Sequence, residues 1–297
     1  MNKHVKKRSI TNRTTSEKIL FAIIFVLFAV YAISLIYPFV WLFMSSLKDY
    51  TDYALDMAQG RPFAFPQEVV WQNYADAFAK MEIKETTFPL MFLNSVWISG
   101  VGLCVSLSVT AIFSYTVSRF RFRGNSVIYA GVIFQMVVPI VGNSGGAFKL
   151  MYDLGLYDSP LYVVVINLGV SGFNFLIFYG FFKNISADYA NAVYIDGGGE
   201  WMAYFKVIFP QSMPVVIALG IMGLIGMWND YMTPLLYLPS FPTIASGMYL
   251  VRESMIRTGK DPIYFAAVVL SVIPVLVLFI CFSDTIMKNM SIGGLKG

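Results

Sequence analysis

Six long stretches of apolar residues alternate with shorter polar segments along the chain. They cover residues 19–44, 89–117, 126–143, 160–182, 211–230 and 263–284. A helix that crosses the hydrocarbon core of a bilayer needs about 20 mostly apolar residues, so the pattern predicts six transmembrane helices. The third stretch is the least regular, because Pro139 and Gly142 interrupt its end. We therefore expect an all-α, polytopic membrane protein.

The polar segments predict how this membrane domain is divided. They are an N-terminal tail (1–18), two outer loops (45–88 and 234–262), an elbow (183–210) and a C-terminal tail (291–297). Residues 19–290 form a single six-helix transmembrane domain in this interpretation. We find no internal repeat and no second soluble domain.

Lysine and arginine are concentrated on one side of the predicted helices. The segments on the side of the N-terminus contain Lys3, Lys6, Lys7, Arg8, Arg13, Lys18, Arg119, Arg121, Arg123, Lys183, Lys206, Lys288 and Lys296. These are 13 of the 21 basic residues, which leaves eight for the longer segments on the other side. Because short cytoplasmic loops are enriched in Lys and Arg, we expect both termini and the elbow in the cytoplasm.

The composition supports a multi-pass protein of the cell (cytoplasmic or inner) membrane. Hydrophobic residues are 57% of the chain and charged residues 13%, whereas soluble domains have roughly 25% charged residues. The mean hydropathy is +0.66. The basic bias of the cytoplasmic side accounts for the net charge of +4, so we expect no nucleic-acid partner. The stretch 19–44 is longer than the roughly 7–15 apolar residues of a cleaved signal peptide.

Few residues in the chain could perform catalysis. His4 is the only histidine, and it lies in the basic tail. Cys104 and Cys281 fall inside apolar stretches, where we expect each to be a small buried hydrophobe. The sequence has no zinc-binding spacing and no phosphate-binding G-x-x-x-x-G-K-[ST] loop. We therefore expect a non-enzymatic chain that binds no cofactor of its own.

The most informative segment is residues 183–214, with the sequence KNISADYANAVYIDGGGEWMAYFKVIFPQSMP. It is too polar to cross a bilayer. Ser186 is a suitable N-cap, and Asp188 then lies in the first helical turn, where the helix dipole favours a carboxylate. Tyr189, Ala192 and Val193 share one face of this short helix.

A glycine turn divides this segment into two short helices. Gly197, Gly198 and Gly199 end the first helix, because glycine adopts left-handed conformations without a steric penalty. A second short helix is expected from Glu200 to Phe209, and Pro210 is expected to end it. The prediction is a helix–turn–helix elbow at the membrane surface, shaped to dock against a partner.

The spacing of the elbow resembles the signature loop of the membrane subunits of ATP-binding-cassette importers. That signature reads E-A-A, three residues, G, nine residues, I, one residue, L-P. The same register here contains Asn191-Ala192-Val193, Gly197, Val207 and Phe209-Pro210. Asn191 replaces the family glutamate and Val193 replaces the second alanine. The run Tyr194–Gly197 is similar to the sugar-importer branch of the family.

Further motifs resemble the same family along most of the chain. They are Ser46-Leu47-Lys48, Asn73-Tyr74, Tyr115–Gly124, Trp228-Asn229-Asp230-Tyr231 with Pro234-Leu235, and the C-terminal Ser291–Gly297. The region 139–152 departs most from the family pattern.

The resemblance implies one permease subunit of a binding-protein-dependent importer, with carbohydrate as the substrate. It implies four further components: a second, homologous permease, an ATPase dimer that holds ATP and Mg, a bilayer, and an extracytoplasmic solute-binding protein that loop 234–262 contacts. The elbow, over 186–209, would couple to the ATPase. The expected coupling residues are Asp188, Asn191, Ala192, Tyr194, Asp196, Gly197, Gly198, Glu200 and Trp201.

Polar and aromatic side chains inside the apolar stretches are candidates for the substrate pathway. They are Asn94, Tyr115, Gln135, Asn167, Asn174 and Tyr179. Amides and aromatic rings suit a sugar, but such residues also form contacts between membrane helices.

Other functions remain open at this stage. Glycerol phosphate derivatives are the nearest alternative substrates within the family. A secondary, ion-coupled transporter or a channel is the alternative class. Against it, Asp230 and Asp284 lie only at the ends of stretches, whereas ion-coupled carriers usually place ionisable groups near the bilayer centre. A membrane scaffold or enzyme is a third reading, which no nucleophile–base pair or metal cluster supports.

Overall fold

The computed structural model describes residues 15–83, 85–138 and 144–290, which are largely helical. The tails 1–14 and 291–297 lie outside the described residues, as do Pro139 and Gly142. The first elements are α1 (Thr15–Ser46), α2 (Tyr50–Ala58), α3 (Gln72–Lys80), β1 (Glu82–Ile83), β2 (Thr86–Thr87), α4 (Phe88–Arg119), α5 (Asn125–Val137) and α6 (Ser144–Asp153). They are followed by α7 (Leu161–Ile166), α8 (Gly172–Asn184), α9 (Asp188–Ile195), α10 (Glu200–Ala203), the π-helix η2 (Tyr204–Ile208), α11 (Phe209–Gln211), α12 (Met213–Asn229), α13 (Met232–Tyr237), α14 (Ile244–Arg257) and α15 (Asp261–Met290).

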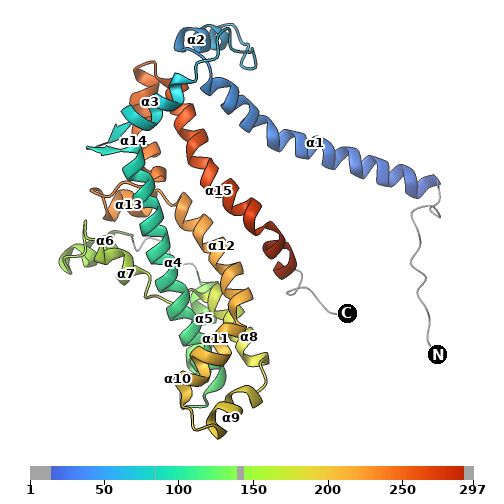
Figure 1. The fold of residues 1–297 in the computed structure, drawn as a ribbon, viewed down its shortest axis with the longest axis vertical. Helices are drawn as coiled ribbons and strands as arrows, with labels where there is room; N and C mark the ends of the chain where they lie inside the picture. The colour runs from blue at the N-terminus through green and yellow to red at the C-terminus, as the bar shows by residue number, and fades with distance from the viewer. Residues whose placement is uncertain (1–14, 84, 139–143, 291–297) are drawn as a thin grey trace.

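Helix α4 is the central element of the fold. It packs along α8 and α12, and α5 packs against α8 (Figure 1). The short helices α9 and α10 lie at one end of this bundle, which we call the elbow end. Helices α2, α3 and α14 lie at the opposite end, together with the antiparallel β1–β2 pair, in which Glu82 faces Thr87 and Ile83 faces Thr86.

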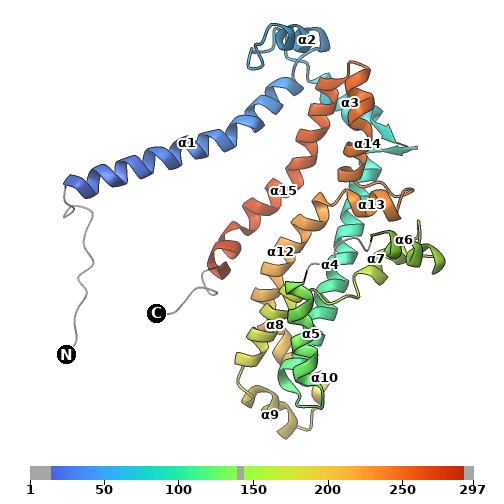
Figure 2. The ribbon, with the colours of Figure 1, turned by 180° about the vertical axis from the view of Figure 1, so that it is seen from behind.

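Helix α1 extends away from the bundle and approaches it only at the end opposite the elbow (Figure 2). There Trp41 packs edge-on against Phe265 of α15, with ring centroids 5.2 Å apart. The most apolar 18-residue window of α1 has no buried residue. An apolar helix of 32 residues whose most apolar window is unburied requires lipid or another protein around that window.

Three described helices are long and apolar enough to cross a membrane, namely α1, α4 and the first part of α15. A fourth crossing results if the segment Glu200–Gln211 and α12, which meet at an angle of 69°, are counted together. The chain is therefore a helical membrane protein. The predicted boundaries 89–117 and 211–230 agree closely with α4 and α12.

The stretch 160–182 is not the continuous helix that we predicted. It consists of α7 and α8, separated by residues 167–171. Gly169 and Ser171 lie in this break, and the Asn167 side chain donates to the Val163 carbonyl 2.8 Å away. The mean hydropathy of the stretch does not reveal such an interruption. A glycine and an asparagine that bonds to its own helix backbone weaken a helix, but they change the mean over the whole stretch little. Within the predicted stretch 126–143, the structure describes helix α5, which ends at Val137.

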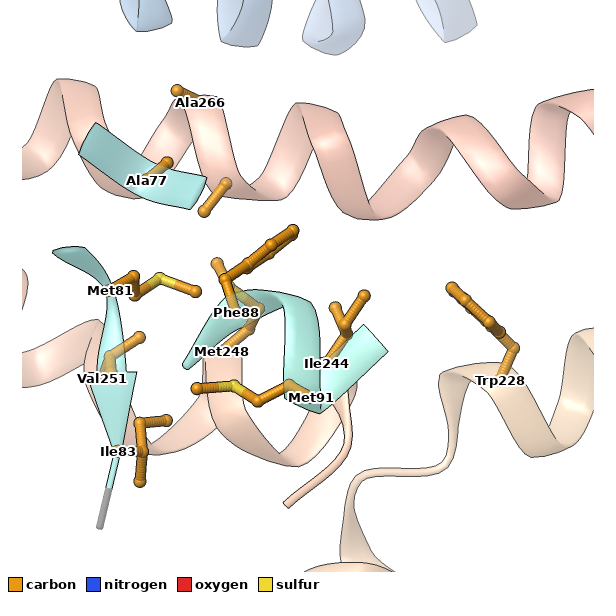
Figure 3. Close-up of a cluster of buried hydrophobic side chains, with 11 residues drawn as sticks. Ala77, Met81, Ile83, Phe88, Met91, Trp228, Ile244, Met248, Val251 and Ala266 are labelled. Carbon is orange, nitrogen blue, oxygen red and sulfur yellow. The ribbon is translucent and has the colours of Figure 1, made fainter. Parts of the chain in front are cut away.

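The core at the end opposite the elbow joins segments that are far apart in sequence. Figure 3 shows Met81, Phe88 and Met91 in one buried cluster with Met248 of α14. Ala266 of α15 closes the same cluster. The predicted outer loop 234–262 is therefore mostly helix, with one face of α14 buried in this core.

A buried ion pair and an amide connect the end of α1 to the following segment. The Lys48 ammonium lies 2.5 Å from an Asp56 carboxylate oxygen, and the Lys48 side chain is 0% exposed. The Asn73 amide donates to the carbonyls of Ser46 and Lys48 at 2.9 and 2.8 Å. The Ser46 hydroxyl contacts the Tyr74 hydroxyl at 2.7 Å. The Ser-Leu-Lys and Asn-Tyr motifs are thus parts of one contact.

The two cysteines are not buried as we predicted. Cys104 on α4 and Cys281 on α15 are both exposed free thiols in this chain. Apolar sequence context does not distinguish a helix face that packs inside the chain from one that faces lipid or a partner.

We predict that Lys48→Met strongly destabilises the protein. It leaves the buried Asp56 carboxylate without its main partner, which typically costs about 3–5 kcal/mol, so Tm in detergent should fall by at least about 5 °C. Arg61→Gln is the matched control, because Arg61 lies 3.6 Å from Asp56 but is 61% exposed. Its Tm should change by less than about 2 °C. Equal stability of the two variants would contradict a structural role for the buried pair.

Candidate functional site

The elbow begins with α9, whose first turn is stabilised by Ser186. The Ser186 hydroxyl accepts a hydrogen bond from the Asp188 backbone N–H at 3.2 Å and donates to the Asp188 carboxylate at 2.8 Å. The N-cap itself is Ala187, one residue later than we predicted. Ser186 bonds to the residue two positions on, as serine does in turns that precede helices.

The predicted glycine turn after α9 is confirmed. Gly197 has φ +80°, a conformation in which a Cβ atom is unfavourable. The N–H groups of Gly197 and Gly198 donate to the carbonyls of Tyr194 and Val193 at 3.0 and 2.8 Å, which is the bond pattern of a Schellman motif. A Cβ on Gly198 would lie 2.5 Å from the Val193 side chain, whereas the space around Gly199 is open.

A side-chain hydrogen bond closes the turn. The Tyr194 hydroxyl donates to a Glu200 carboxylate oxygen at 2.5 Å. Burial, together with this bond to a carboxylate, raises the pKa of Tyr194 to about 12. The hydroxyl therefore remains a donor throughout the physiological pH range, and this bond links α9 to the first residue of α10.

The helical path continues through Pro210 instead of ending there, which corrects our prediction. The π-helix η2 precedes α11, and Pro210 occupies the first turn of α11. A π turn has a wider hydrogen-bond ring than an α turn, and it separates the proline ring from the carbonyl with which it would otherwise clash. The main bend of 69° follows, between Gln211 and Met213.

The inner face of the elbow is buried against the membrane helices. Tyr204 is 2% exposed and Ile208 0%. The Tyr204 ring lies 4.8 Å from the ring of Tyr115 on α4 and 6.4 Å from Phe182 on α8, measured between centroids. Nearby, the Arg119 guanidinium donates to the Ile185 carbonyl at 2.6 Å. The elbow is therefore attached to both α4 and α8.

The outer face of the elbow is exposed and apolar. Trp201 is 65% exposed and stacks on Phe205, with centroids 5.7 Å apart. Helix α9 has no buried residue. The structure places the predicted coupling residues at this end of the bundle, with Asp188, Asn191, Ala192, Asp196 and Glu200 exposed.

Sequence reasoning did not name four further exposed side chains of the elbow as coupling candidates, although it placed Tyr189 on an apolar helix face. They are Tyr189, Ile195, Met202 and Phe205. The spacing of Trp201 and Phe205, four residues apart, could have indicated their shared face. We call the exposed set Tyr189, Ile195, Trp201, Met202 and Phe205 the aromatic–apolar surface of the elbow.

Two of the predicted pathway residues are engaged in packing within the chain. The Asn94 amide donates to the Pro242 carbonyl at 3.1 Å and accepts from the Trp97 indole at 3.1 Å. Tyr115 lies in the aromatic contact with Tyr204 and Phe182. These contacts join α4 to the segment before α14 at one end and to the elbow at the other.

The other four predicted pathway residues do not meet at one site. Gln135 is exposed on α5, and Asn174 is half-buried on α8. Tyr179 packs against Tyr129, with centroids 4.8 Å apart, near the elbow end. Asn167 lines a cavity of about 150 Å³ toward the opposite end.

This cavity could accept a small polar group. It is lined by Ile98, Tyr162, Val163, Ile166, Asn167, Met227, Asp230, Thr233, Pro234 and Leu238. One Asp230 carboxylate oxygen accepts from the Thr233 N–H at 3.0 Å, and Asn167 presents an amide. Among the described residues, no group of three His, Cys, Asp or Glu side chains could hold a metal ion.

Comparisons with known proteins agree on one family. The family described as "Binding-protein-dependent transport system inner membrane component" matches residues 11–291. The permease protein NgcG of a diacetylchitobiose uptake system from Streptomyces coelicolor is 28% identical, over 94% of this chain and 90% of that protein. The melibiose/raffinose/stachyose import permease protein MelC from Bacillus subtilis is 22% identical, over 93% and 96%.

A solved structure has the same fold. It belongs to a bacterial ABC transporter involved in the import of the acidic polysaccharide alginate, and it aligns with a TM-score of 0.76 at 23% identity. The alignment covers 92% of this chain and 98% of that chain. A second alginate transporter structure, in complex with a pentasaccharide-bound periplasmic protein, aligns with a TM-score of 0.57 at 15% identity.

We predict that Tyr194→Phe loosens the turn between α9 and α10. Loss of one hydrogen bond should raise amide hydrogen exchange at Gly197–Gly199 roughly two- to tenfold. Tyr189→Phe is the control, because Tyr189 is exposed on the same helix. The raised pKa predicts that in the unaltered protein the bond's stabilisation is complete below pH 10 and is lost as the pH rises through about 12. Identical exchange in both variants would contradict this role.

Proposed function

This chain belongs to the family of inner membrane components of binding-protein-dependent transport systems, and we propose that it is one permease subunit of an ATP-driven carbohydrate importer. It forms half of the translocation pathway, and a second, homologous permease forms the other half. The chain is not an enzyme. Its energy comes from a separate ATPase dimer that binds ATP and Mg.

The observation that supports this function best is the two-sided elbow. Its inner face is fixed to α4 and α8 through Tyr204, and its outer face presents exposed aromatic rings such as Trp201. An exposed cluster of large apolar side chains marks a binding surface. We propose that the ATPase covers it, and that Asp188, Asp196 and Glu200 make polar contacts around its rim.

Six membrane crossings are our proposal for the topology. The described helices that they contain are α1, α4, α5, α7 with α8, α12 and α15. The basic residues near the elbow end support a cytoplasmic elbow and cytoplasmic termini. This topology places the 150 Å³ cavity on the extracytoplasmic side of the pathway.

The surfaces of the chain suit the remaining partners. The exposed apolar window of α1 and the exposed thiols of Cys104 and Cys281 indicate apolar faces for the second permease and the bilayer. On the outer side, Tyr231 stacks on the exposed Tyr249 of α14, with centroids 4.9 Å apart. We propose that α13 and α14 contact a solute-binding protein.

The carbohydrate substrate is inferred from the relatives. NgcG is named for the uptake of diacetylchitobiose, and MelC for the import of melibiose, raffinose and stachyose. Asn167 and Asp230 offer hydrogen-bond partners for hydroxyl groups, and Tyr162 offers a ring beside them. Asn167 is therefore the pathway candidate that the cavity supports best, while Gln135 and Asn174 stay predictions.

Co-purification tests the assembly. The full-length chain should be extracted from native membranes in mild detergent, and mass spectrometry should find a second permease and an ATPase with a phosphate-binding loop. Uptake of labelled oligosaccharide should stop when ATP is depleted and continue when ion gradients are collapsed. Recovery of the chain alone, with uptake that follows an ion gradient, would establish a secondary transporter instead.

We predict that the glycine turn is required for coupling. Gly197→Val forces a β-branched residue into a left-handed conformation, which costs about 1–3 kcal/mol, and Gly198→Leu collides with Val193. Both variants should lose most ATP-dependent uptake, while the ATPase remains active or becomes independent of substrate.

Two conservative variants are the controls for this prediction. Gly197→Asn keeps a residue that tolerates the left-handed region, and Gly199→Ser adds a good N-cap in open space. Both should retain at least about half of the uptake. Wild-type uptake in Gly197→Val and Gly198→Leu would refute the coupling role of the turn.

A further inference from the structure

A second and larger cavity lies near the elbow end, apart from the cavity lined by Asn167 and apart from the glycine turn. Its volume is about 630 Å³. It is formed where α4 ends, α5 begins and α8 ends. The lining residues are Val117, Ser118, Phe120, Arg121, Phe122, Arg123, Asn125, Ser126, Tyr179 and Lys183.

The charge of this cavity is positive and uncompensated. Arg121, Arg123 and Lys183 line it, and no acidic side chain does. Among the described residues, none of the three lies within 4.0 Å of a carboxylate. Three like charges around one cavity repel each other and create a local positive potential. An anion would relieve that repulsion.

Contacts within the chain hold part of the cavity wall. The Asn125 amide donates to the carbonyls of Val117 and Phe120 at 2.8 and 2.7 Å, which holds the 120–124 turn against the end of α4. Gly124 has φ +93° and starts α5. The Lys183 ammonium lies 5.5 Å from the centroid of the Tyr179 ring, a distance suited to a cation–π contact.

The surroundings indicate which anion fits. The cavity lies where the apolar helices end, and the exposed side chains of Phe122 and Val127 lie beside it in the chain. The rest of α5 also exposes large apolar residues, such as Phe134. A phosphate in the cavity could therefore have acyl chains along α5. A soluble anion would make no use of this apolar surface.

We propose that this cavity binds the phosphate headgroup of an anionic phospholipid. Arg121, Arg123 and Lys183 supply the positive charge, and the Ser118 and Ser126 hydroxyls are further donors at the cavity wall. The cytoplasmic placement of the site rests on the topology proposed above. Basic cavities between membrane helices are typical sites for anionic lipid headgroups.

The test measures lipid retention directly. The full-length chain, with the subunits that co-purify, is placed in nanodiscs of phosphatidylcholine with or without phosphatidylglycerol, and native mass spectrometry counts the retained phosphatidylglycerol. Arg121→Gln, Arg123→Gln and Lys183→Gln should each lower its affinity by about fivefold, and the triple variant by much more. Lys206→Gln, which removes an exposed cation at the same end but outside the cavity, should not change it.

Charge-preserving variants guard against a simple folding defect. Lys183→Arg and Arg121→Lys should retain phosphatidylglycerol at close to the unaltered level. Equal retention by the triple variant and the unaltered protein would overturn the proposal. So would full displacement of the lipid by millimolar inorganic phosphate, which would identify a soluble anion as the ligand.

Two further outcomes separate this site from the proposed function. Loss of the co-purifying ATPase in the triple variant, with lipid retention unchanged, would show that a protein partner occupies the cavity and would overturn the lipid site. Retention of phosphatidylglycerol by a chain that purifies without any ATPase would support the lipid site while refuting the importer.

Discussion

The contact of Tyr204 with Tyr115 and Phe182 is the packing interaction on which the attachment of the elbow to α4 and α8 depends. It is the aromatic part of the contact between the elbow and the membrane helices, to which Arg119 adds a hydrogen bond to Ile185. Helix α9 has no buried residue of its own, and the buried residues Ala203, Tyr204 and Ile208 all follow the glycine turn. Aromatic pairs with such spacing contribute about 0.5–1.5 kcal/mol each beyond the area that they bury. A force applied to the exposed surface of the elbow therefore reaches α4 and α8 through this group of rings.

The opposite end of α4 is fixed by polar contacts. The Asn94 amide bonds to the Pro242 carbonyl, and the Ser95 hydroxyl accepts from the Ile244 N–H at 2.8 Å. In an apolar environment a buried polar group without a partner is costly, so these bonds resist separation of α4 from α14. Helix α4 is thus bonded at one end to the elbow and at the other to the segment of this chain that we propose contacts a solute-binding protein.

Hydropathy and local spacing predicted the parts of the fold that depend on nearby residues. The limits of α4 and α12 follow from the length of their apolar runs, and the Gly197 turn follows from the conformational freedom of glycine. The parts that depend on distant residues could not be predicted. Pro210 lies within a helical path because Tyr204 and Ile208 pack on α4 and α8 and set the register of a π turn there. The break after Asn167 leaves the apolar average nearly unchanged, and the exposure of Cys104 reflects packing that no single sequence displays.

The family motifs acquire a physical meaning from this arrangement. Ser46, Lys48 and Asn73 belong to motifs separated by more than twenty residues, yet their backbone and side-chain atoms bond to one another. Tyr115 begins another motif, and Gly197 belongs to the elbow signature; each lies at a joint between elements rather than within a binding cavity. The replacement of the signature glutamate by Asn191 is compatible with this reading, because Asn191 is exposed on α9 and the angle of the elbow depends on Tyr194, Glu200 and the glycines. The contacts that set the turn in this structure involve Tyr194, Glu200 and the glycines, and the exposed side chain of Asn191 lies outside them.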